Sequence, residues 1–421
     1  MVALWSVATL SFSAGTRAQP QATITLEPTK QPGSFDLLIG GKLWFPAGAP
    51  TSMRHKGTVY SVADGSLKLR RNTQPESGSD TLGTFERTSW LWSANVFPSG
   101  LAFETATRVY KTAVVFEQTW IGGAVDSSAH DKENLISTFP SFGMPAADTA
   151  AAGSSAPPPR GYLQYHGDMV GSGYHIGKFD RNSDGIGSGV SGTAPLCIFA
   201  QDMATSAVLS PYSNFMAVSQ HYADHAISYG LMGNITQVPA GYKAEVVLVV
   251  GGGVTDAMFA WGDALLSTYG KQREAAWQKD FTLKRLGYST DNGAYYYYNT
   301  EKGMNYEDTM LGVAKYAAEA NIPYRYWLAD SWWYFKGVGN GVYNWTAMPS
   351  IFPHGMAGVY DATSWLVQGH NRYWSADTNY AKQNGGKWNF LVDNSSGYAL
   401  PYDQAFWNYL MSSSKKWGLT V

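Results

Sequence analysis

The hydrophobic pattern of this chain changes its period once, near residue 255, and this change limits the folds open to it. From about residue 21 to 260, short β-type runs recur, as at 105–110 and 113–120, and Gly, Asn, Asp and Ser clusters separate many of them. After that point apolar residues return at helical spacing, beginning with 256–269. The chain is therefore expected to contain an all-β region followed by a region of another class.

The first region, residues 21–260, is predicted to be a large β-sandwich. Its short strand-like runs and frequent turn residues are typical of antiparallel sandwiches. Residues 145–159 are rich in Ala, Ser and Pro, and we interpret them as a low-complexity loop because β-type runs resume afterwards. Residues 261–281 continue the helical pattern and are expected to form a connector.

The second region, residues 282–421, alternates strand-like and helix-like segments. Asn305 is predicted to cap a helix that runs to about residue 320, followed by a strand at 324–330. Alternation of this kind is typical of βα units around a parallel sheet or barrel. The other predicted strands are 286–298 (with its following loop) and 368–375, and the other predicted helices are 356–367 and one that opens at Pro401 and ends before Gly418.

The second region is too short for a complete barrel of βα units. A complete (β/α)8 barrel takes about 250 residues, whereas residues 282–421 number 140. The fold class expected is therefore multidomain, β followed by α/β, with a partial (β/α)8 TIM-type barrel truncated near its fourth strand. Residues 419–421 would begin that strand. The alternative is a smaller, complete α/β domain.

The charge balance and the cysteine count exclude several functional classes. Thirty Lys and Arg against 32 Asp and Glu give a net charge of −2, without the positive excess of a nucleic-acid-binding protein. The one cysteine, Cys197, excludes an intrachain disulfide and a cysteine-based zinc site, and is expected to be a small buried residue. No apolar run reaches the roughly 18 residues of a membrane span.

The first twenty residues are interpreted as a possible signal peptide. An apolar run at 2–12 precedes small residues and a potential cleavage point after Ala18, although no Lys or Arg precedes the run. The alternative is a ragged N-terminus of a gene model. Asn234, Asn344 and Asn394 lie in Asn-x-Ser/Thr triplets. A glycoprotein that is secreted, or endomembrane and lysosome-like, is therefore expected.

Polar and aromatic residues gather where the predicted strands end. In a βα barrel the carboxyl ends of the strands form the ligand site. Carboxylates accept hydrogen bonds from sugar hydroxyls, and indole faces stack on the apolar faces of sugar rings. Asp291 and Asp393 can alternatively be interpreted as turn residues. The candidate binding residues are Asp291, Asn292, Asp330, Trp332, Trp333, His370, Arg372, Trp374 and Asp393.

Four segments resemble the barrel of the retaining α-glycosidase clan, most nearly the α-galactosidase-like and raffinose-synthase-like hydrolases of families 36 and 31. They are LGYSTDNGAYYYY (286–298), WLADSWWYFKG (327–337), FPHGM (352–356) and HNRYW (370–374). The resemblance implies a β-supersandwich before the barrel and a carbohydrate substrate, an α-linked hexose or oligosaccharide. It also implies that Asp330 binds a sugar hydroxyl and that Trp332, Trp333 and Trp374 form the walls of the subsite.

The same resemblance implies where the catalytic carboxylates belong. In this clan the nucleophilic Asp ends the fourth strand and the acid/base Asp ends the sixth, and both positions would lie beyond Val421. Retaining hydrolysis needs both groups. The chain is therefore expected to be glycoside hydrolase-like but inactive as given, with no residue assigned a catalytic role. The alternatives are a non-catalytic, lectin-like carbohydrate-binding protein and a nucleotide-binding α/β enzyme that uses the turn at 251–253.

Three further motifs are interpreted as structural. Residues 245–253 imitate a dinucleotide-binding turn, but Asp256 stands where the third glycine belongs. Residues 180–185 begin like a calcium loop, but no Glu follows at the twelfth position. His221 and His225 are four apart, without the Glu of a zinc-binding H-E-x-x-H motif. No metal and no cofactor is predicted.

Overall fold

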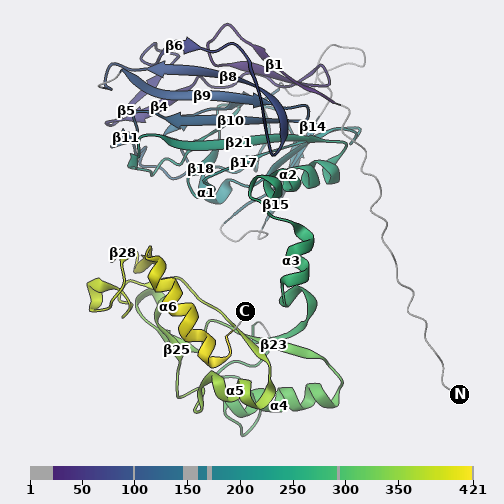
Figure 1. Cartoon of the computed structure of the whole chain (residues 1–421), viewed down its shortest axis with the longest axis vertical. Coiled ribbons are helices and arrows are strands. Elements are labelled where there is room, and N and C mark those ends of the chain that lie inside the picture. Colours follow the sequence, from purple (N-terminus) through teal and green to yellow (C-terminus); the bar gives the residue numbers. More distant parts are fainter. Residues whose placement is uncertain (1–21, 98–99, 146–159, 168–172, 292–293, 420–421) are drawn as a thin grey trace, which may run out of the picture. The chain divides into compact units, whose positions relative to one another are not determined.

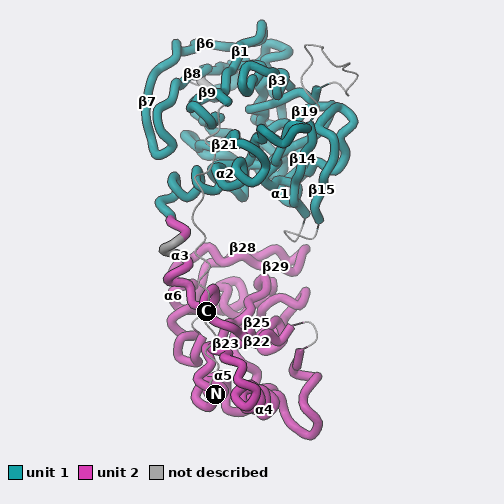
Figure 2. The backbone as a smooth tube through the Cα atoms, turned by 90° about the vertical axis from the view of Figure 1, so that its right-hand side faces the viewer, with its two compact units in different colours: residues 1–271 teal, residues 272–421 magenta. Residues whose placement is uncertain are grey.

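The computed structural model describes residues 22–97, 100–145, 160–167, 173–291 and 294–419. The chain divides into two compact units, Met1–Lys271 and Gln272–Val421, which Figure 2 shows in separate colours. The first unit is mostly β, and the second combines helices with two small sheets (Figure 1). The possible signal peptide and residues 146–159 lie outside the described residues.

An antiparallel sheet of ten strands forms the centre of the first unit (Figure 1). Strand β10 coincides with the run predicted at 113–120. Across the sheet the order is β15 (Tyr174–Lys178), β14 (Arg160–Tyr165), β16 (Leu196–Ala200), β17 (Ser206–Pro211), β21 (Tyr242–Gly251), β10 (Ala113–Trp120), β9 (Leu101–Val109), β8 (Gly83–Ser93) and β6 (Lys68–Asn72), with β7 (Glu76–Asp80) also paired to β8.

The two faces of this sheet bury different partners, because alternate residues of a strand point to opposite faces. Val114 and Phe116 of β10 lie in the main core of the unit. Val115, between them, lies in a second cluster with Ala264 of helix α2 (Val254–Thr268). The unbroken apolar run at 114–116 therefore serves two cores, one on each side of the sheet.

Smaller sheets cover the face of the large sheet that holds the main core. Phe35 stacks on Phe116 with ring centres 5.8 Å apart, and Phe45 contacts Phe142 at 5.1 Å. These sheets are β1 (Ile24–Pro28), β2 (Phe35–Ile39) and β3 (Lys42–Phe45); β12 (Ser137–Thr138), β4 (Ser52–His55) and β5 (Thr58–Ser61); β13 (Ser141–Gly143), β19 (Ala226–Leu231) and β18 (Val218–Ala223). The pair β11 (Ala124–Val125) and β20 (Gln237–Val238) and the short helix α1 (Gly189–Gly192) complete the unit.

The second unit contains a parallel sheet in the order β22 (Leu286–Ser289), β23 (Tyr324–Ala329) and β26 (Leu366–Gly369). Helix α4 (Tyr306–Glu319) joins the first two strands, and α5 (Gly355–Thr363) precedes the third. An isolated parallel bridge joins Leu419 to Val367 of β26. The unit therefore contains consecutive parallel strands with helices between them. It begins with α3 (Arg273–Lys279), and its 3-10 turns are Thr282–Lys284, Val338–Asn340, Lys382–Asn384 and Lys415–Trp417.

The cap predicted for helix α4 is confirmed. The Asp308 backbone N–H donates to Asn305 Oδ1 at 2.8 Å, which satisfies one of the free N–H groups at the helix start. The acidic Glu307 and Asp308 occupy the first turn, where the helix dipole favours negative charge. The helix ends before Asn321, whose φ of 56° cannot continue it.

Removing the cap is expected to cost stability. We expect Asn305→Ala to lower the free energy of unfolding by about 1 kcal/mol, because the Asp308 N–H loses its acceptor. Asn305→Ser keeps a capping oxygen and is expected to retain most of the stability. Urea denaturation of both variants checks this, and an equal loss in both would show that the cap is not the cause.

Two predicted helix boundaries in the second unit are wrong. Helix α5 ends at Thr363 and not near 367, because Ser364 adopts a left-handed φ of 56°. Pro401 ends a strand, and helix α6 (Gln404–Ser414) begins after Asp403, whose carboxylate accepts the Ala405 N–H at 3.1 Å. The Asp403 cap, and not Pro401, therefore determines where helix α6 begins.

A second, five-stranded sheet was not predicted. Its strands are short and come from the segments that follow β23 and β26, so their pairing is not visible in any local pattern. The strand predicted at 368–375 is divided between the two sheets. The order is β24 (Tyr334–Lys336), β25 (Val342–Ala347), β27 (Trp374–Ser375), β29 (Tyr398–Pro401) and β28 (Phe390–Asp393).

Candidate functional site

The carboxyl ends of the three parallel strands lie side by side, because the strands pair in register in the order β22, β23, β26. Thr290 and Asp291 follow the first strand, Asp330 follows the second, and His370 follows the third. Three of the polar segments predicted at strand ends are therefore neighbours in space.

Hydrogen bonds between backbone and side chains hold these strand ends together. The buried Thr290 hydroxyl donates to Leu328 O at 2.6 Å and accepts the Asp330 N–H at 3.2 Å. The His370 N–H donates to Ala329 O at 2.9 Å. The positions of Asp330 and His370 are thus fixed by the sheet and not by a free loop.

Five titratable side chains gather at this edge, and we call them the strand-end cluster: Asp291, Asp330, Lys336, His370 and Arg372. Burial lowers the pKa of His370; Asp330 and Asp291 oppose this shift, whereas Arg372 and Lys336 add to it. Burial also lowers the pKa of Lys336, with a contribution from Arg372 and an opposing one from Asp330. The charges of the cluster therefore influence the pKa values of His370 and Lys336.

Buried groups beneath the cluster hold His370 in place. The Tyr334 hydroxyl lies 3.3 Å from His370 Nδ1, and Trp345 Nε1 donates to His370 O at 2.9 Å. Tyr334 is almost fully buried, and this burial raises the pKa of its hydroxyl. Tyr334 therefore remains a neutral phenol that supports the imidazole from the core side.

The cluster suits a neutral ligand that carries many hydroxyls. With His370 neutral, the two carboxylates balance Lys336 and Arg372, and the set offers both hydrogen-bond acceptors and donors. Tyr373 adds an aromatic ring that is 41% exposed, lies 5.6 Å from the Arg372 guanidinium, and donates its hydroxyl to Gly339 O at 2.6 Å. An exposed ring beside balanced polar groups is typical of sugar sites.

The three tryptophans of the candidate site differ from what the resemblance implies. Trp332, Trp333 and Trp374 are buried in the aromatic core of the second unit. Trp333 packs on Trp345 at 5.4 Å between ring centres, and Trp374 packs on Phe406 at 5.0 Å. The large apolar area of an indole favours such burial. These three indoles support the strand ends from the core side and are not exposed to a ligand.

Asp393 does not join the cluster. Asp393 ends β28 in the five-stranded sheet and is exposed. The Ser395 hydroxyl donates to its Oδ1 and lowers the pKa of its carboxyl to about 2, and the Ser396 hydroxyl donates to its backbone O. This is the turn role that the sequence left open. Asn292 lies outside the described residues.

Four residues of this site were not predicted from the sequence: Thr290, Tyr334, Lys336 and Tyr373. Thr290 and Tyr373 are direct neighbours of predicted site residues, so a rule that included flanking residues would have found them. Lys336 and Tyr334 lie on β24, close to Asp330 in sequence, and tertiary contacts bring them near His370.

The other motifs have structural explanations in the described residues. A Cβ on Gly251 would lie 2.3 Å from Ala257 N, so this glycine permits close strand–helix packing in an antiparallel sheet. Asp180 Oδ1 accepts the Asn182 N–H at 2.7 Å within a turn. Burial raises the pKa of the Cys197 thiol to about 12, as expected for a buried cysteine. Among the described residues, no group of three or more His, Cys, Asp or Glu is placed to hold a metal.

The three Asn-x-Ser/Thr triplets differ in their exposure. Asn234 and Asn394 are exposed, whereas Asn344 is half-buried and its Oδ1 accepts the Tyr380 hydroxyl at 2.9 Å. Glycosylation remains a prediction. Within the described residues, every helix is too short or too polar to cross a membrane.

The lowered pKa of His370 gives a pH prediction with a defined sign. In the folded state this pKa lies below 6.5, so the unfolded chain binds more protons between the two values. The free energy of unfolding is therefore expected to rise with pH between the two pKa values. Below the folded pKa, the protonation of His370 has its full destabilising effect. NMR titration is expected to show the pKa falling further in Asp330→Asn and rising in Arg372→Gln; the reverse order would contradict the geometry.

Comparison with known proteins supports a fold assignment. No protein-family model matches the chain, and no curated protein matches its sequence. The solved structure of the α-N-acetylgalactosaminidase NagBb from Bifidobacterium bifidum, in complex with GalNAc, aligns with 95% of this chain at a TM-score of 0.54 and 13% identity. An α-galactosidase from Lactobacillus brevis and a Glycoside Hydrolase Family 97 enzyme from Pseudoalteromonas sp. strain K8 each align with 94% at a TM-score of 0.49, with 12% and 10% identity. The chain has an α-glycosidase-like fold.

The alignments cover only part of these neighbours. The chain spans 67% of the length of NagBb, 64% of the Family 97 enzyme and 57% of the α-galactosidase.

Proposed function

We propose that this protein binds carbohydrate at the strand-end cluster of its second unit. The observation that carries the proposal is the meeting of Asp330, His370 and Arg372 at the ends of neighbouring parallel strands, beside the exposed ring of Tyr373. Asp330 and Asp291 would accept sugar hydroxyls, Arg372 and Lys336 would donate to ring and hydroxyl oxygens, and Tyr373 would stack on the sugar face. The α-glycosidase-like fold is consistent with this ligand class.

The strand order supports a (β/α)8-type arrangement for the second unit. We propose that β22, β23 and β26 are the first strands of such a barrel, following a β-supersandwich. Each successive strand is the parallel neighbour of the previous one, and Leu419 continues this order beside Val367. In barrels the ligand site is built at this end of the strands, where the cluster lies.

We further propose that the 421-residue chain holds its ligand, an α-linked hexose or oligosaccharide, without hydrolysing it. Retaining hydrolysis needs one carboxylate to attack the anomeric carbon and a second to protonate the leaving oxygen, about 5 Å apart. We assign Asp291 and Asp330 to hydroxyl binding instead, because Asp330 shares a network with Lys336, His370 and Arg372. A retaining α-glycosidase activity is the alternative outcome.

Binding and turnover can be measured side by side with the full chain. Saturation-transfer NMR with galactose, N-acetylgalactosamine and glucose is expected to show saturable binding of at least one sugar. Aryl α-glycosides of the same sugars are expected to bind without release of the aryl group above background. Absence of binding to every sugar would overturn the proposal, whereas turnover would overturn only its non-catalytic part.

A further inference from the structure

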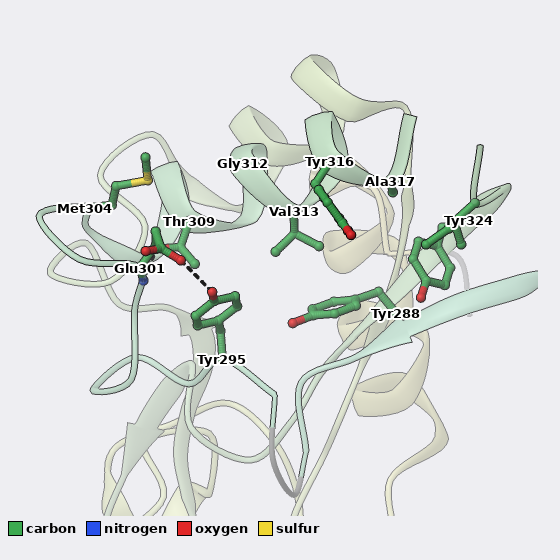
Figure 3. Close-up of a pocket in the computed structure, with 11 residues that line it drawn as sticks. Tyr288, Tyr295, Glu301, Met304, Thr309, Gly312, Val313, Tyr316, Ala317 and Tyr324 are labelled. Atoms are coloured by element: carbon green, nitrogen blue, oxygen red, sulfur yellow. Dashed lines mark hydrogen bonds between the residues drawn. The ribbon is translucent and has the colours of Figure 1, made fainter. Parts of the chain in front are cut away.

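A pocket of about 510 Å³ lies between strand β22 and helix α4 in the second unit (Figure 3). We call it the tyrosine pocket; it is defined here by Tyr288, Tyr295, Glu301, Gly312, Val313 and Tyr316. Tyr288 and Tyr295 form one wall, and Val313 and Tyr316 of α4 face them from the other (Figure 3). It shares no residue with the strand-end cluster, and its volume is in the range of small-molecule sites.

The walls of the tyrosine pocket are held in place by hydrogen bonds among its lining residues and with Tyr306. Tyr295 donates its hydroxyl to Glu301 Oε2 at 2.7 Å, and the Glu301 N–H donates to the Thr309 hydroxyl at 3.1 Å, which ties the acid to the first turn of α4. The Tyr306 hydroxyl donates to Tyr295 O at 3.4 Å. The pocket is therefore largely formed before any ligand enters, which reduces the ordering cost of binding.

The polar groups of the pocket restrict the ligand class. The Tyr295 hydroxyl bond lowers the pKa of the Glu301 carboxyl, so this rim residue is an anion that repels anionic ligands. In the described part of the chain, Glu301 forms no ion pair, and its oxygens retain unused acceptor positions. A purely apolar ligand would cover the tyrosine hydroxyls without offering them partners, which is unfavourable.

We infer that the tyrosine pocket is a second sugar site, which takes one neutral pyranose ring. The C–H faces of the ring would lie on Tyr288 and Tyr316, and a ring hydroxyl would donate to Glu301. Val313 and the backbone at Gly312 leave space for the ring, because a Cβ added at Gly312 would meet no atom within 4 Å. This inference rests on the proposed carbohydrate function but concerns a different site.

The open space at Gly312 permits a test that does not weaken the fold. Gly312→Leu would place its side chain in the pocket while replacing a poor helix former by a good one in α4. We expect at least a tenfold loss of affinity at this pocket, with no decrease in melting temperature. Ala318→Leu, at an exposed position of the same helix, is the matched control and is expected to leave affinity unchanged.

The affinity at this site is measured through Met304, which lines the pocket. In the full chain labelled with 13C-methyl methionine, methyl α-galactoside, methyl α-glucoside and N-acetylgalactosamine are added in turn. Saturable movement of the Met304 signal by at least one sugar is expected, and Met304→Leu assigns the signal. The movement is expected to be lost in Gly312→Leu, reduced several-fold in Glu301→Gln, and kept in Asp330→Asn.

The outcomes separate this inference from the proposed function. If sugar binds the chain, and Met304 does not respond or Gly312→Leu leaves its response unchanged, the second site is wrong and the strand-end site stands. If Met304 responds but Asp330→Asn changes no binding, the strand-end site is wrong. A response to tetramethylammonium and to no sugar would overturn the assignment of the pocket to a neutral ring.

Discussion

Replacing Asp330 by asparagine is expected to weaken sugar binding at the strand ends at least tenfold. A hydrogen bond to a charged group contributes roughly 1.5–3 kcal/mol, and about 1.4 kcal/mol corresponds to a factor of ten in affinity. The Ser331 N–H donates to Asp330 Oδ1, and asparagine keeps an oxygen there. The substitution therefore removes the charge while preserving the local turn, and the unfolding free energy is expected to change little.

Calorimetric titration of the sugar that gives the strongest NMR response checks this expectation. Asp361→Asn on α5, an exposed carboxylate away from the strand ends, is the matched control and is expected to bind normally. Asp330→Ala removes the turn acceptor as well, and is expected to lose binding with a modest loss of stability. Normal affinity in Asp330→Asn, or a large loss of stability with it, would show that Asp330 is structural.

Replacing Trp333 by alanine is expected to lower the free energy of unfolding of the second unit by roughly 3–5 kcal/mol. The side chain is 0% exposed and packs against Trp345, Trp417 and Tyr334. Its Nε1 donates to Ala329 O at 3.1 Å, so the substitution also leaves a backbone acceptor without this partner. Such a cavity lies directly beneath the strand end that carries Asp330.

The control for this variant is Trp277→Ala, since Trp277 is 60% exposed on α3. Exposed substitutions usually change the unfolding free energy by less than about 0.5 kcal/mol. Thermal and urea denaturation, followed by the aromatic circular dichroism of the chain, compare the two variants. If Trp333→Ala keeps full stability but loses sugar binding, the indole is a wall of the site, as the resemblance implies, and not part of the core.

Features that depend on neighbours in sequence were predictable. The cap at Asn305 requires only that its side chain reach the N–H of Asp308, three residues away. The strand β10 was recognisable from its β-type apolar run alone, and its bounds agree with the prediction. Asp330 was identified at a strand end because it directly follows the apolar run 326–329.

Features that depend on distant partners were not predictable in this way. The five-stranded sheet pairs segments such as β25 and β27, which are separated by helix α5 and strand β26. The interaction of Lys336 with His370 likewise joins residues that are distant in sequence. The choice between a buried and an exposed aromatic ring has the same origin: Trp374 and Tyr373 are adjacent in sequence, yet the first lies in the core and the second is exposed.

The sequence by itself determined the division into a β-rich part and an α/β part, the cap of helix α4, and the residue types at the strand ends. These follow from periodicity and short-range hydrogen bonding, which act between residues a few positions apart. Only the tertiary structure decided which of those residues share one site, that the indoles lie beneath it, and that β22 and α4 enclose the tyrosine pocket. Burial and electrostatic coupling depend on contacts between segments, and no single segment contains that information.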